Sequence, residues 1–408
     1  MKITRVETFA VPPRWLLCRV ETDDGVVGWG EPMVEGRAAT VRTAVRELSE
    51  LLVGQDPLRI EDHWQSMTKG SFYRGGPVLS SAVAGLDQAL WDIAGKVYGA
   101  PVYQLLGGPV RDRVRAYSWV GGDEPAQIAE AVREQVEAGF TAVKMNASGR
   151  MNRLATVRDI DEVVSRAAAA REALGDDRDF AVDFHGRFTV ANAAKLLPHL
   201  APYNPLFVEE PLLPEYTHRL RDLTASSPVP LALGERLYSR TDVLPALTAG
   251  VAVLQPDLSH AGGISEVRRI AALAETFDVL LAPHCPLGPV SLAASLQVAF
   301  TTPNFLIQEQ SVGIHYNVGA GPLEAVREAA AHVHAHGWTV VLDVNHRHRL
   351  WTGEEAGRAL LPLLEHVTVL IASDDELPVV TGAFAERPRG EEAAVDALLA
   401  AGVREVVG

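Results

Sequence analysis

The sequence is poor in cysteine and has no long hydrophobic run. Its two cysteines, Cys18 and Cys285, form no CxxC motif. A disulfide scaffold or a thiolate zinc site is therefore not expected, and a reducing compartment fits. No segment approaches the roughly 20 apolar residues that a membrane-spanning helix needs. The opening stretch MKITRVETFAVPPRW lacks the apolar region of a signal peptide. These absences predict a soluble, cytoplasmic protein with no membrane partner.

Positive charge is also in short supply. The chain has 37 Lys and Arg residues against 52 Asp and Glu residues, a formal net charge of −15. Nucleic acids and anionic membrane surfaces require a basic face, so neither is an expected partner. A small anionic substrate stays possible, because a bound metal ion can reverse the local sign of the charge. Apolar residues make up 47% of the sequence, enough for a large core in one domain with satellites, or for two to three domains.

Residues 1–111 predict a mixed α+β domain. TRVETFAV and LLCRVET are strand-like, and Asp23-Asp24-Gly25 turns the second of them into VVGWGEP, as in a hairpin. Three stretches with helical spacing of apolar residues follow, near 38–53, 59–68 and 77–98. Asp87 and Asp92, in the last stretch, are interpreted as a solvated or capped face.

From about residue 112, short apolar runs alternate with longer helical stretches. The eight runs are VRAYSWV, TAVKMN, FAVDFH, LFVEE, PLALGE, VAVLQPD, VLLAPH and FLIQEQ. Strands that alternate with helices indicate parallel βαβ units, and eight of them favour a barrel over an open sheet. Nearly every run ends in polar or ionisable residues: Lys144 with Asn146, Asp183 with His185, Glu209, Glu235, Asp257, His284 and Glu309. Because barrel active sites lie at the carboxyl ends of the strands, we expect these side chains to meet at one mouth.

Three carboxylates in this set recur at a regular spacing. Asp183, Glu209 and Glu235 are each 26 positions from the next, one per βα unit. Like charges on neighbouring strands repel, and some would be protonated unless a cation lay among them. Oxygen ligands favour a hard divalent ion such as Mg²⁺. The alternative is that each acid caps the helix after it, which explains three acids in register less well. Glu210 is expected on the opposite face of its strand.

Two histidines accompany the acids. His185 lies two residues past Asp183 and therefore shares that strand's inward face. His284 ends the strand after the one that Asp257 ends, so Asp257 could hold one ring nitrogen of His284 and raise its basicity. A single histidine at a strand end is more often structural, but two beside a triple-acid cluster favour a catalytic role. Cys285 is interpreted as a small buried thiol.

A family resemblance rests on motifs spread over residues 1–317. They are PPRW, GVVGWGEP, FYRGGP, QALWDIAGK, YSWVGGD, VDFHGR, FVEEP, LALGER, LQPDLSHAGG, LAPHCPLGP and QEQSVGIHYN. Together they resemble the mandelate racemase branch of the enolase superfamily, most closely its galactonate dehydratases. The resemblance implies an α/β fold, with a modified TIM barrel of seven βα units plus a final strand (112–318) under an N-terminal α+β capping domain (1–111). It also implies Mg²⁺ on Asp183, Glu209 and Glu235.

The resemblance further implies a Mg²⁺-dependent sugar-acid dehydratase that converts D-galactonate to 2-keto-3-deoxygalactonate. His284, backed by Asp257, would take the C2 proton, and Glu309 would hydrogen-bond the enediolate. His185 would protonate the leaving 3-hydroxyl. Lys144, and Asn146 beside it, would contact the substrate. Racemases of the family carry Lys-x-Lys where this chain has Lys144-Met145-Asn146, so elimination is favoured over racemisation.

Residues 319–408 depart from that family, which carries a segment here that returns to the cap. LDVNHRHRLW, VTVLIASDDEL and LLAAGVREVV resemble part of a ribokinase-family sugar kinase, most like the 2-keto-3-deoxygluconate kinases. That family's sugar-binding half and its Gly-Ala-Gly-Asp motif with the catalytic aspartate are missing. The resemblance therefore implies a partial α/β segment without kinase activity.

Three functions follow as hypotheses. The first is the sugar-acid dehydratase. The second is a catalytically weakened chimera that binds a sugar acid or a partner without efficient turnover. The third is a racemase or epimerase, which Asn146 disfavours. A small-molecule sugar acid is the expected partner, and a homo-oligomer is expected because barrels of this family usually assemble.

Overall fold

The structure is a computed structural model. It describes residues 1–11, 14–149 and 151–311, and parts of the remainder: 327, 330–331, 334–335, 337, 339–344, 352–373, 375–384, 388 and 390–407. The chain divides into two compact units, Met1–Asn317 and Val318–Gly408, which are described separately. The three predicted domain ranges stay a prediction.

The first unit begins with an antiparallel sheet and four helices, here called the cap. The strands are β1 (Ile3–Val11), β2 (Trp15–Thr22) and β3 (Val27–Gly30), in the order β1-β2-β3. The helices are α1 (Ala38–Ser49), α2 (Ile60–Lys69), α3 (Gly76–Tyr98) and α4 (Val102–Leu105). The predicted hairpin is present, and Gly25 makes its turn with a φ of 80°. Sheet and helix pack so closely that a Cβ on Gly30 would lie 1.9 Å from the Gly85 carbonyl oxygen of α3.

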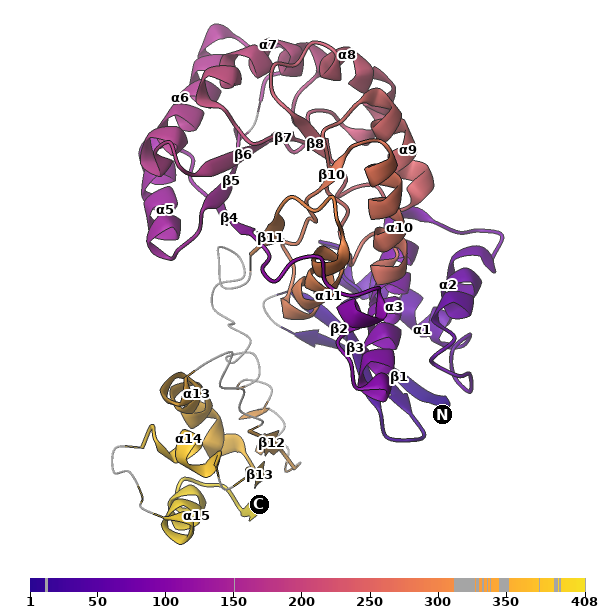
Figure 1. The fold of residues 1–408 in the computed structure, drawn as a ribbon, viewed down its shortest axis with the longest axis vertical. Helices are drawn as coiled ribbons and strands as arrows, with labels where there is room; N and C mark the ends of the chain where they lie inside the picture. The colour runs from indigo at the N-terminus through magenta and orange to yellow at the C-terminus, as the bar shows by residue number, and fades with distance from the viewer. Residues whose placement is uncertain are drawn as a thin grey trace. The chain divides into compact units, whose positions relative to one another are not determined.

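A curled, parallel eight-stranded sheet follows (Figure 1). Its strands are β4 (Ala116–Val120), β5 (Ala142–Asn146), β6 (Asp179–Asp183), β7 (Val208–Glu209), β8 (Leu231–Leu233), β9 (Val253–Leu254), β10 (Leu280–Leu281) and β11 (Gln308–Gln310). They run in the order β10-β9-β8-β7-β6-β5-β4-β11, and a parallel bridge between Leu281 and Phe305 links the two ends of this order. Each predicted run thus contains a strand, although several strands pair over only two residues.

Helices follow the first seven of these strands, and the helices after the first six strands form the outer arc in Figure 1. They are α5 (Pro125–Glu137), α6 (Val157–Leu174), α7 (Val190–Leu200), α8 (Leu220–Thr224), α9 (Arg240–Ala249), α10 (Gly263–Thr276) and α11 (Pro289–Thr301). Short 3₁₀ turns, η1 (Ala201–Tyr203) and η2 (Pro214–Arg219), adjoin α7 and α8. The main core fills the space between these helices and the sheet.

A second buried cluster fills the interior of the ring. It takes one side chain from each strand or its flank: Tyr117, Ala142, Ala181, Phe207, Ala232, Val253, Ala282 and Ile307. Five of the eight are Ala or Val, and Tyr117 and Phe207 occupy the remaining room with ring centroids 6.4 Å apart. Apolar residues that come shortly before the strand ends therefore close the floor, and the polar residues after them face the mouth.

The contact between cap and barrel corrects the interpretation of Asp87 as a solvated residue. Asp87 is fully buried and accepts hydrogen bonds from Ser265 N at 3.0 Å and Ser265 Oγ at 2.6 Å, at the start of α10. Glu31 does the same for α11, accepting from Gly288 N at 2.7 Å and Ser291 N at 2.9 Å. Two cap carboxylates therefore complement the N-termini of two barrel helices, where N–H groups are unpaired and the helix dipole is positive.

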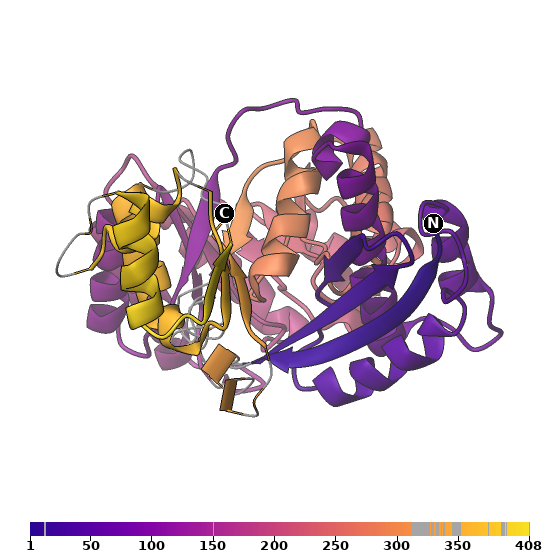
Figure 2. The same ribbon diagram turned by 90° about the horizontal axis from the view of Figure 1, so that it is seen from below.

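The second unit contains a parallel three-stranded sheet in the order β12-β13-β14. Its elements are β12 (Val341–Asp343), α13 (Gly353–Leu360), η4 (Leu361–His366), β13 (Val369–Ile371), α14 (Leu377–Thr381), α15 (Glu391–Ala400) and β14 (Glu405–Val407). Figure 2 shows the helices gathered on one side of this sheet, around a core that includes Leu370 and Leu398. The predicted strands and the two later helices are present. The predicted helix 323–337 lies largely outside the described residues, as do 345–351 of the kinase-like motif.

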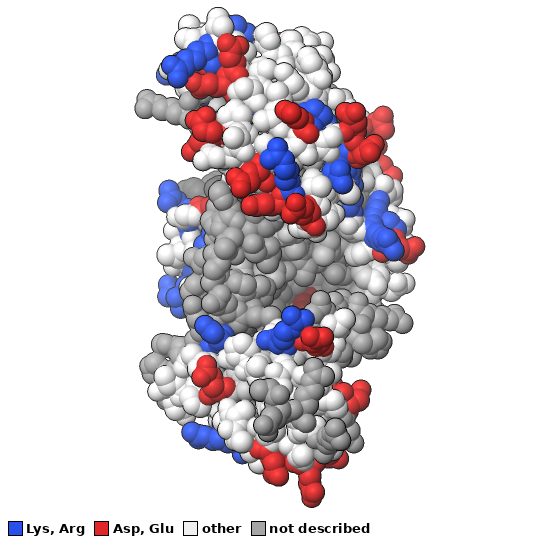
Figure 3. All heavy atoms as spheres, turned by 90° about the vertical axis from the view of Figure 1, so that its left-hand side faces the viewer, with Lys and Arg blue, Asp and Glu red and all other residues white. Residues whose placement is uncertain are grey.

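In the described part of the chain, no helix is long and apolar enough to cross a membrane. On the face drawn in Figure 3, acidic and basic side chains of the described residues are interspersed. That face therefore presents no extended basic stripe among the described residues.

Candidate active site

Polar residues from the carboxyl ends of the barrel strands line one cavity of about 490 Å³. The sheet register brings them there, because Asn146 pairs with Asp183 and Asp183 pairs with Glu209 on adjacent strands. Of the nine residues predicted from the sequence, seven line the cavity: Lys144, Asn146, Asp183, His185, Glu235, His284 and Glu309. Glu209 and Asp257 contact lining residues from just behind the wall.

The three acids predicted to hold a cation occupy different local environments. Asp183 and Glu209 are buried, and Glu235 is 15% exposed at its side chain. Burial raises the pKa of Asp183 well above its usual range, and the charges of Glu209 and Glu235 raise it further. Burial also raises the pKa of Glu209, against the opposing charge of Lys144. Carboxylates that disfavour one another's ionisation are typical of a site that receives a cation.

Lys144 is the cation that the protein itself supplies to this cluster. Its Nζ lies 2.9 Å from Glu209 Oε1 and 3.0 Å from Glu309 Oε1, and the side chain is only 2% exposed. These two charges overcome the effect of burial and raise the pKa of Lys144 well above its usual range. Both of these partners are carboxylates of the protein, so a substrate in the cavity would share Lys144 with them.

His185 stands at the end of β6 in a left-handed backbone conformation, with a φ of 49°. Asp183 fixes this turn, because its Oδ1 accepts the His185 N–H at 2.7 Å and its Oδ2 lies 3.1 Å from His185 Nε2. The imidazole is 35% exposed, and its Nδ1 has no hydrogen-bond partner. Burial, opposed by Glu235, lowers the pKa of His185 to about 4.

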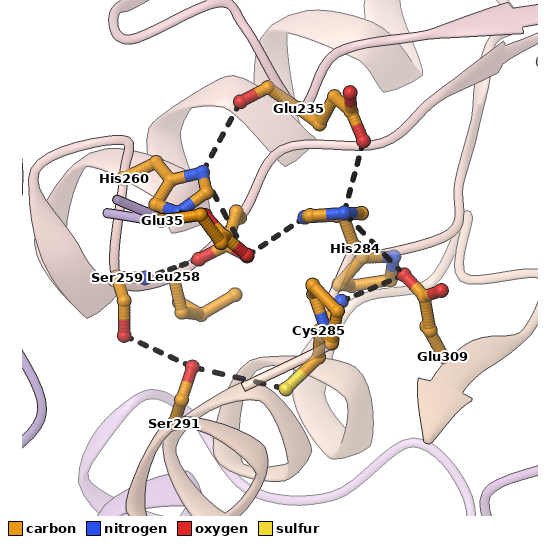
Figure 4. Close-up of polar contacts among 12 residues, drawn as sticks. Glu35, Glu235, Leu258, Ser259, His260, His284, Cys285, Ser291 and Glu309 are labelled. Carbon is orange, nitrogen blue, oxygen red and sulfur yellow. Dashed lines mark hydrogen bonds and ion pairs between the residues drawn. The ribbon is translucent and has the colours of Figure 1, made fainter. Parts of the chain in front are cut away.

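His284 is held on both ring nitrogens (Figure 4). Nδ1 lies 2.8 Å from Asp257 Oδ2, the contact expected between these adjacent strands, and Nε2 lies 2.9 Å from Glu235 Oε2. Burial opposes protonation of His284, but Glu235, Glu309 and Asp257 together raise its pKa well above the usual range. Because Nδ1 is bound to a fully buried Asp257, Nε2 is the nitrogen that is directed at the cavity.

Glu309 closes the ring of polar groups at the end of β11. Its Oε2 accepts the Cys285 N–H at 2.9 Å, and its Oε1 faces Lys144. Burial raises its pKa, but Lys144 and His284 lower it more, so the net shift is downward. Cys285 itself is a buried thiol whose pKa burial raises, which fits the inert role predicted for it. Glu210 pairs with Arg236 and lines a separate small pocket with Leu212 and Leu237.

The carboxylates need rearrangement before all three could share one ion. Ligand oxygens around Mg²⁺ lie about 2.0–2.1 Å from it, so any two are at most roughly 4.2 Å apart. Among the described residues, the group of three ligand side chains that meets a spacing of 4.8 Å is Asp257, His260 and His284, not the predicted trio. Glu209 forms an ion pair with Lys144, and Glu235 forms one with His284. At least one of these acids would have to move away from its present partner to bind the shared ion.

The Asp257, His260 and His284 group is better explained as a hydrogen-bonded network than as a metal site. His284 already contacts carboxylates through both nitrogens. His260 lies 3.2 Å from Glu35 Oε2 through Nε2 and 3.3 Å from the Glu235 carbonyl through Nδ1. In contrast, Asp183, Glu209 and Glu235 offer oxygen atoms alone, the donor set that hard divalent cations prefer. The chemistry of the trio therefore fits a divalent cation, although its present spacing does not.

Several residues that line this cavity were not predicted from the sequence, and Glu35 and His260 are the ionisable pair among them. His260 lies three residues past Asp257 in DLSH, a spacing that gives a local signal. Glu35 comes from the cap loop between β3 and α1, and no local pattern places that loop over the barrel. Against the effect of burial, His260 lowers the pKa of Glu35 to about 2, and Asp257 together with Glu35 raises the pKa of His260 to about 9.

Comparisons with known proteins agree with this geometry. Residues 7–107 match the mandelate racemase / muconate lactonizing enzyme N-terminal domain, and residues 127–347 match the enolase C-terminal domain-like family. A D-galactonate dehydratase of Ralstonia pickettii (strain 12J) is 55% identical over 331 residues, which are 81% of this chain and 87% of that protein. The matched part includes residues up to 347, beyond the first compact unit.

Solved structures are similar to the same part of the chain. A mandelate racemase/muconate lactonizing enzyme from Jannaschia sp. CCS1 superimposes with a TM-score of 0.73 at 35% identity, covering 76% of this chain and 87% of its own. An enolase from Agrobacterium radiobacter, solved with Na and L-malate bound, gives 0.72 at 37% identity, covering 76% and 80%. The chain therefore belongs to the mandelate racemase and muconate lactonizing enzyme family of the enolase superfamily.

Proposed function

We propose that the protein is a sugar-acid dehydratase, a hydro-lyase that converts D-galactonate to its 2-keto-3-deoxy product. The observation that carries the proposal is the pair of histidines in one acid-lined cavity, His185 on β6 and His284 after β10. These strands are four places apart in the order of eight, so the two rings enter the cavity from opposite sides. The similarity to the Ralstonia pickettii D-galactonate dehydratase supports the choice of substrate.

Dehydration begins with removal of a proton from C2, next to the substrate carboxylate. This proton is weakly acidic because the electron pair left behind adds negative charge beside an anion. In our proposal Asp183, Glu209 and Glu235 hold Mg²⁺. When bound, the ion supplies Lewis-acid stabilisation of that charge. The L-malate in the Agrobacterium radiobacter enolase is a 2-hydroxy acid, which is compatible with a related substrate here.

His284 is the proposed base. Asp257 accepts a hydrogen bond from Nδ1 at 2.8 Å, which fixes the tautomer and orients Nε2. The role requires a neutral ring, so the proton that the neighbouring acids favour on His284 in the protein alone must leave before the reaction. A buried carboxylate behind the imidazole then stabilises the imidazolium formed when the C2 proton arrives. Glu309 lies 3.9 Å from the same Nε2 and is proposed to contact the enediolate oxygen.

His185 is the proposed acid for departure of the 3-hydroxyl. Hydroxide is a poor leaving group and needs a proton as the C–O bond breaks. The half-exposed ring can reach a substrate in the cavity. In the protein alone its lowered pKa keeps it neutral at pH 7, so the ring must gain a proton when the substrate is bound.

Asn146 is proposed as a substrate ligand, with Lys144 behind it. The Asn146 Oδ1 is buried and makes no hydrogen bond, so a substrate hydroxyl could satisfy it. An asparagine cannot act as a second base opposite His284, which argues for elimination and against racemisation. Lys144 is also proposed to contact the substrate, because it lines the cavity.

Two further features belong to the proposal. We infer that the second unit is a ribokinase-like segment without kinase activity, on the support of its parallel sheet and its motifs. We also propose that the protein assembles as a homo-oligomer in the cytoplasm, as barrels of this family usually do.

An assay for 2-keto-3-deoxy acids with semicarbazide, across a panel of sugar acids with Mg²⁺, tests the function. Product from D-galactonate supports it. Formation of no product from any acid would favour the weakened chimera. Deuterium incorporation at C2 without dehydration would favour a racemase or epimerase.

A further inference from the structure

Lys144 occupies a position that the proposed reaction does not explain. Its ammonium lies 2.9 and 2.8 Å from the two oxygens of Glu209 and 3.0 Å from Glu309 Oε1. Both acids are buried, with exposures of 0% for Glu209 and 2% for Glu309. The ammonium also lies over the Tyr117 ring, 5.4 Å from its centroid. The protein therefore supplies two carboxylates and an aromatic ring as partners for this cation.

The surroundings make this cation necessary when no other is bound. Glu209 and Glu309 both contact Lys144, and Asp183 pairs in register with Glu209. Buried carboxylates without a counter-charge are strongly destabilising, and removal of one partner from a buried ion pair leaves the other uncompensated. Lys144 reaches into the cluster from β5, the strand beside β6.

We propose that Lys144 is a positioning residue, the resident counter-cation of Glu209 and Glu309, and that it competes with a divalent cation for the Glu209 carboxylate. The inference rests on the proposed function, which assigns Glu209 as a cation ligand. It adds a role to the substrate contact proposed for Lys144, because the ammonium that lines the cavity also serves the carboxylate cluster.

The competition predicts the direction in which the affinity for a divalent cation should change. An ammonium within 2.8 Å of a carboxylate oxygen repels a second cation that approaches the same group, and this repulsion is strong at a buried site. Removal of the ammonium should therefore tighten divalent-cation binding, on the order of tenfold or more. If Lys144 held only the substrate, its removal would leave the affinity for the cation alone unchanged.

The experiment compares Lys144→Met with Lys195→Met in the full chain. Lys195 is exposed on α7, so its substitution removes the same formal charge away from the cluster. Mn²⁺ binding is measured by isothermal titration calorimetry without substrate, and melting is followed with and without Mn²⁺. We expect Lys144→Met to melt lower than wild type without metal, to bind Mn²⁺ more tightly and to gain more in melting temperature from it. Lys195→Met should behave as wild type.

A second variant, Glu309→Gln, covers the case in which Lys144→Met does not fold without metal. This near-isosteric change removes one of the two carboxylates that hold Lys144, so Glu209 alone should hold it. Mn²⁺ should then compete less well for Glu209 and bind more weakly, which is the opposite of the change expected for Lys144→Met. A folded Lys144→Met protein with equal or weaker Mn²⁺ affinity, or a Glu309→Gln protein with equal or tighter affinity, would overturn this inference alone. A wild-type protein that binds no Mn²⁺ would overturn the cation site of the proposed function as well.

Discussion

At the scale of single residues, the two histidines of the cavity differ in their surroundings. His284 is bound by carboxylates at both nitrogens, whereas His185 is half-exposed and has a free Nδ1. Their pKa values move in opposite directions, because burial dominates at His185 and neighbouring acids dominate at His284. The two rings therefore differ in their readiness to carry a proton, which fits different roles for them in one elimination.

The first prediction separates their roles. His185→Asn should lower dehydration by at least roughly 10²-fold, the usual contribution of a general acid, and still allow C2 hydrogen exchange. Proton NMR in D₂O measures the exchange, and the semicarbazide assay measures the product. His199→Asn, a change at an exposed histidine of α7, is the control. Loss of exchange together with dehydration would contradict the division of roles.

Much of the site at this scale follows from strand ends. The contact between Asp257 and His284 could be predicted because adjacent parallel strands bring their last residues together. The ion pairs of Lys144 could not, since several carboxylates lie within reach of a long side chain. Glu35 was missed because its contact with His260 spans 225 positions (260 − 35) of the chain and depends on how the cap covers the barrel.

At the scale of elements, the cap is joined to the barrel through buried acids at helix starts. Asp87 of α3 is the clearest example, because burial raises its pKa to about 7 although Ser265 donates two hydrogen bonds to it. The sequence shows a helix with an aspartate on it, and helical periodicity cannot tell a solvated acid from one that meets another helix. Because α3 is buried on nearly all sides, Asp87 meets another helix and not solvent.

The second prediction concerns pH and this acid. The folded state binds the Asp87 proton up to about pH 7, whereas the unfolded state loses it near pH 4. The folded state therefore binds more protons between these values, so this group lowers stability as pH rises from about 4 to 7. Asp87→Asn should remove this pH dependence of the free energy of unfolding. The change amounts to about 4 kcal/mol between pH 4 and pH 7, for a pKa shift of about three units.

Urea unfolding of wild type and Asp87→Asn at pH 5 and pH 7 measures the effect. The difference in free energy of unfolding between wild type and the variant should shrink, or change sign, from pH 5 to pH 7. Asp92→Asn is the matched control, because Asp92 lies on the same helix and pairs with Lys96 near the surface. Parallel pH profiles for wild type and Asp87→Asn would refute the assignment.

The third prediction concerns the cap loop after β3. Glu35 lines the cavity and its Oε2 lies 3.2 Å from His260, so its carboxylate is placed to accept a hydrogen bond from a substrate hydroxyl. Loss of a hydrogen bond to a charged group costs about 1.5–3 kcal/mol, so Glu35→Ala should lower kcat/KM at least roughly tenfold, mainly through KM. Steady-state kinetics test it, with exposed Glu50→Ala as the control. An unchanged kcat/KM would exclude contact with substrate.

At the scale of the whole molecule, the chain has two compact units with separate hydrophobic cores. Periodicity predicted the alternation of strands and helices in both, because apolar runs and helical spacing are local signals. The fold family of the second unit is harder to predict from the sequence. Its three strands and short helices are compatible with many α/β folds, and the ribokinase resemblance stays a prediction.

The last prediction uses this division. All nine predicted site residues lie in the first unit, and none lies in the second. A divalent cation that binds the carboxylate cluster should stabilise the state that holds it by mass action, so Mg²⁺ should slow hydrogen exchange in peptides that span 183–309. Peptides that span 353–407 should exchange at the same rate with Mg²⁺ as with EDTA. Hydrogen-exchange mass spectrometry of the full chain gives both readings at once. Equal protection of both regions by Mg²⁺ would show either a cation bound elsewhere or units that unfold together, and it would remove the support for a site confined to the barrel.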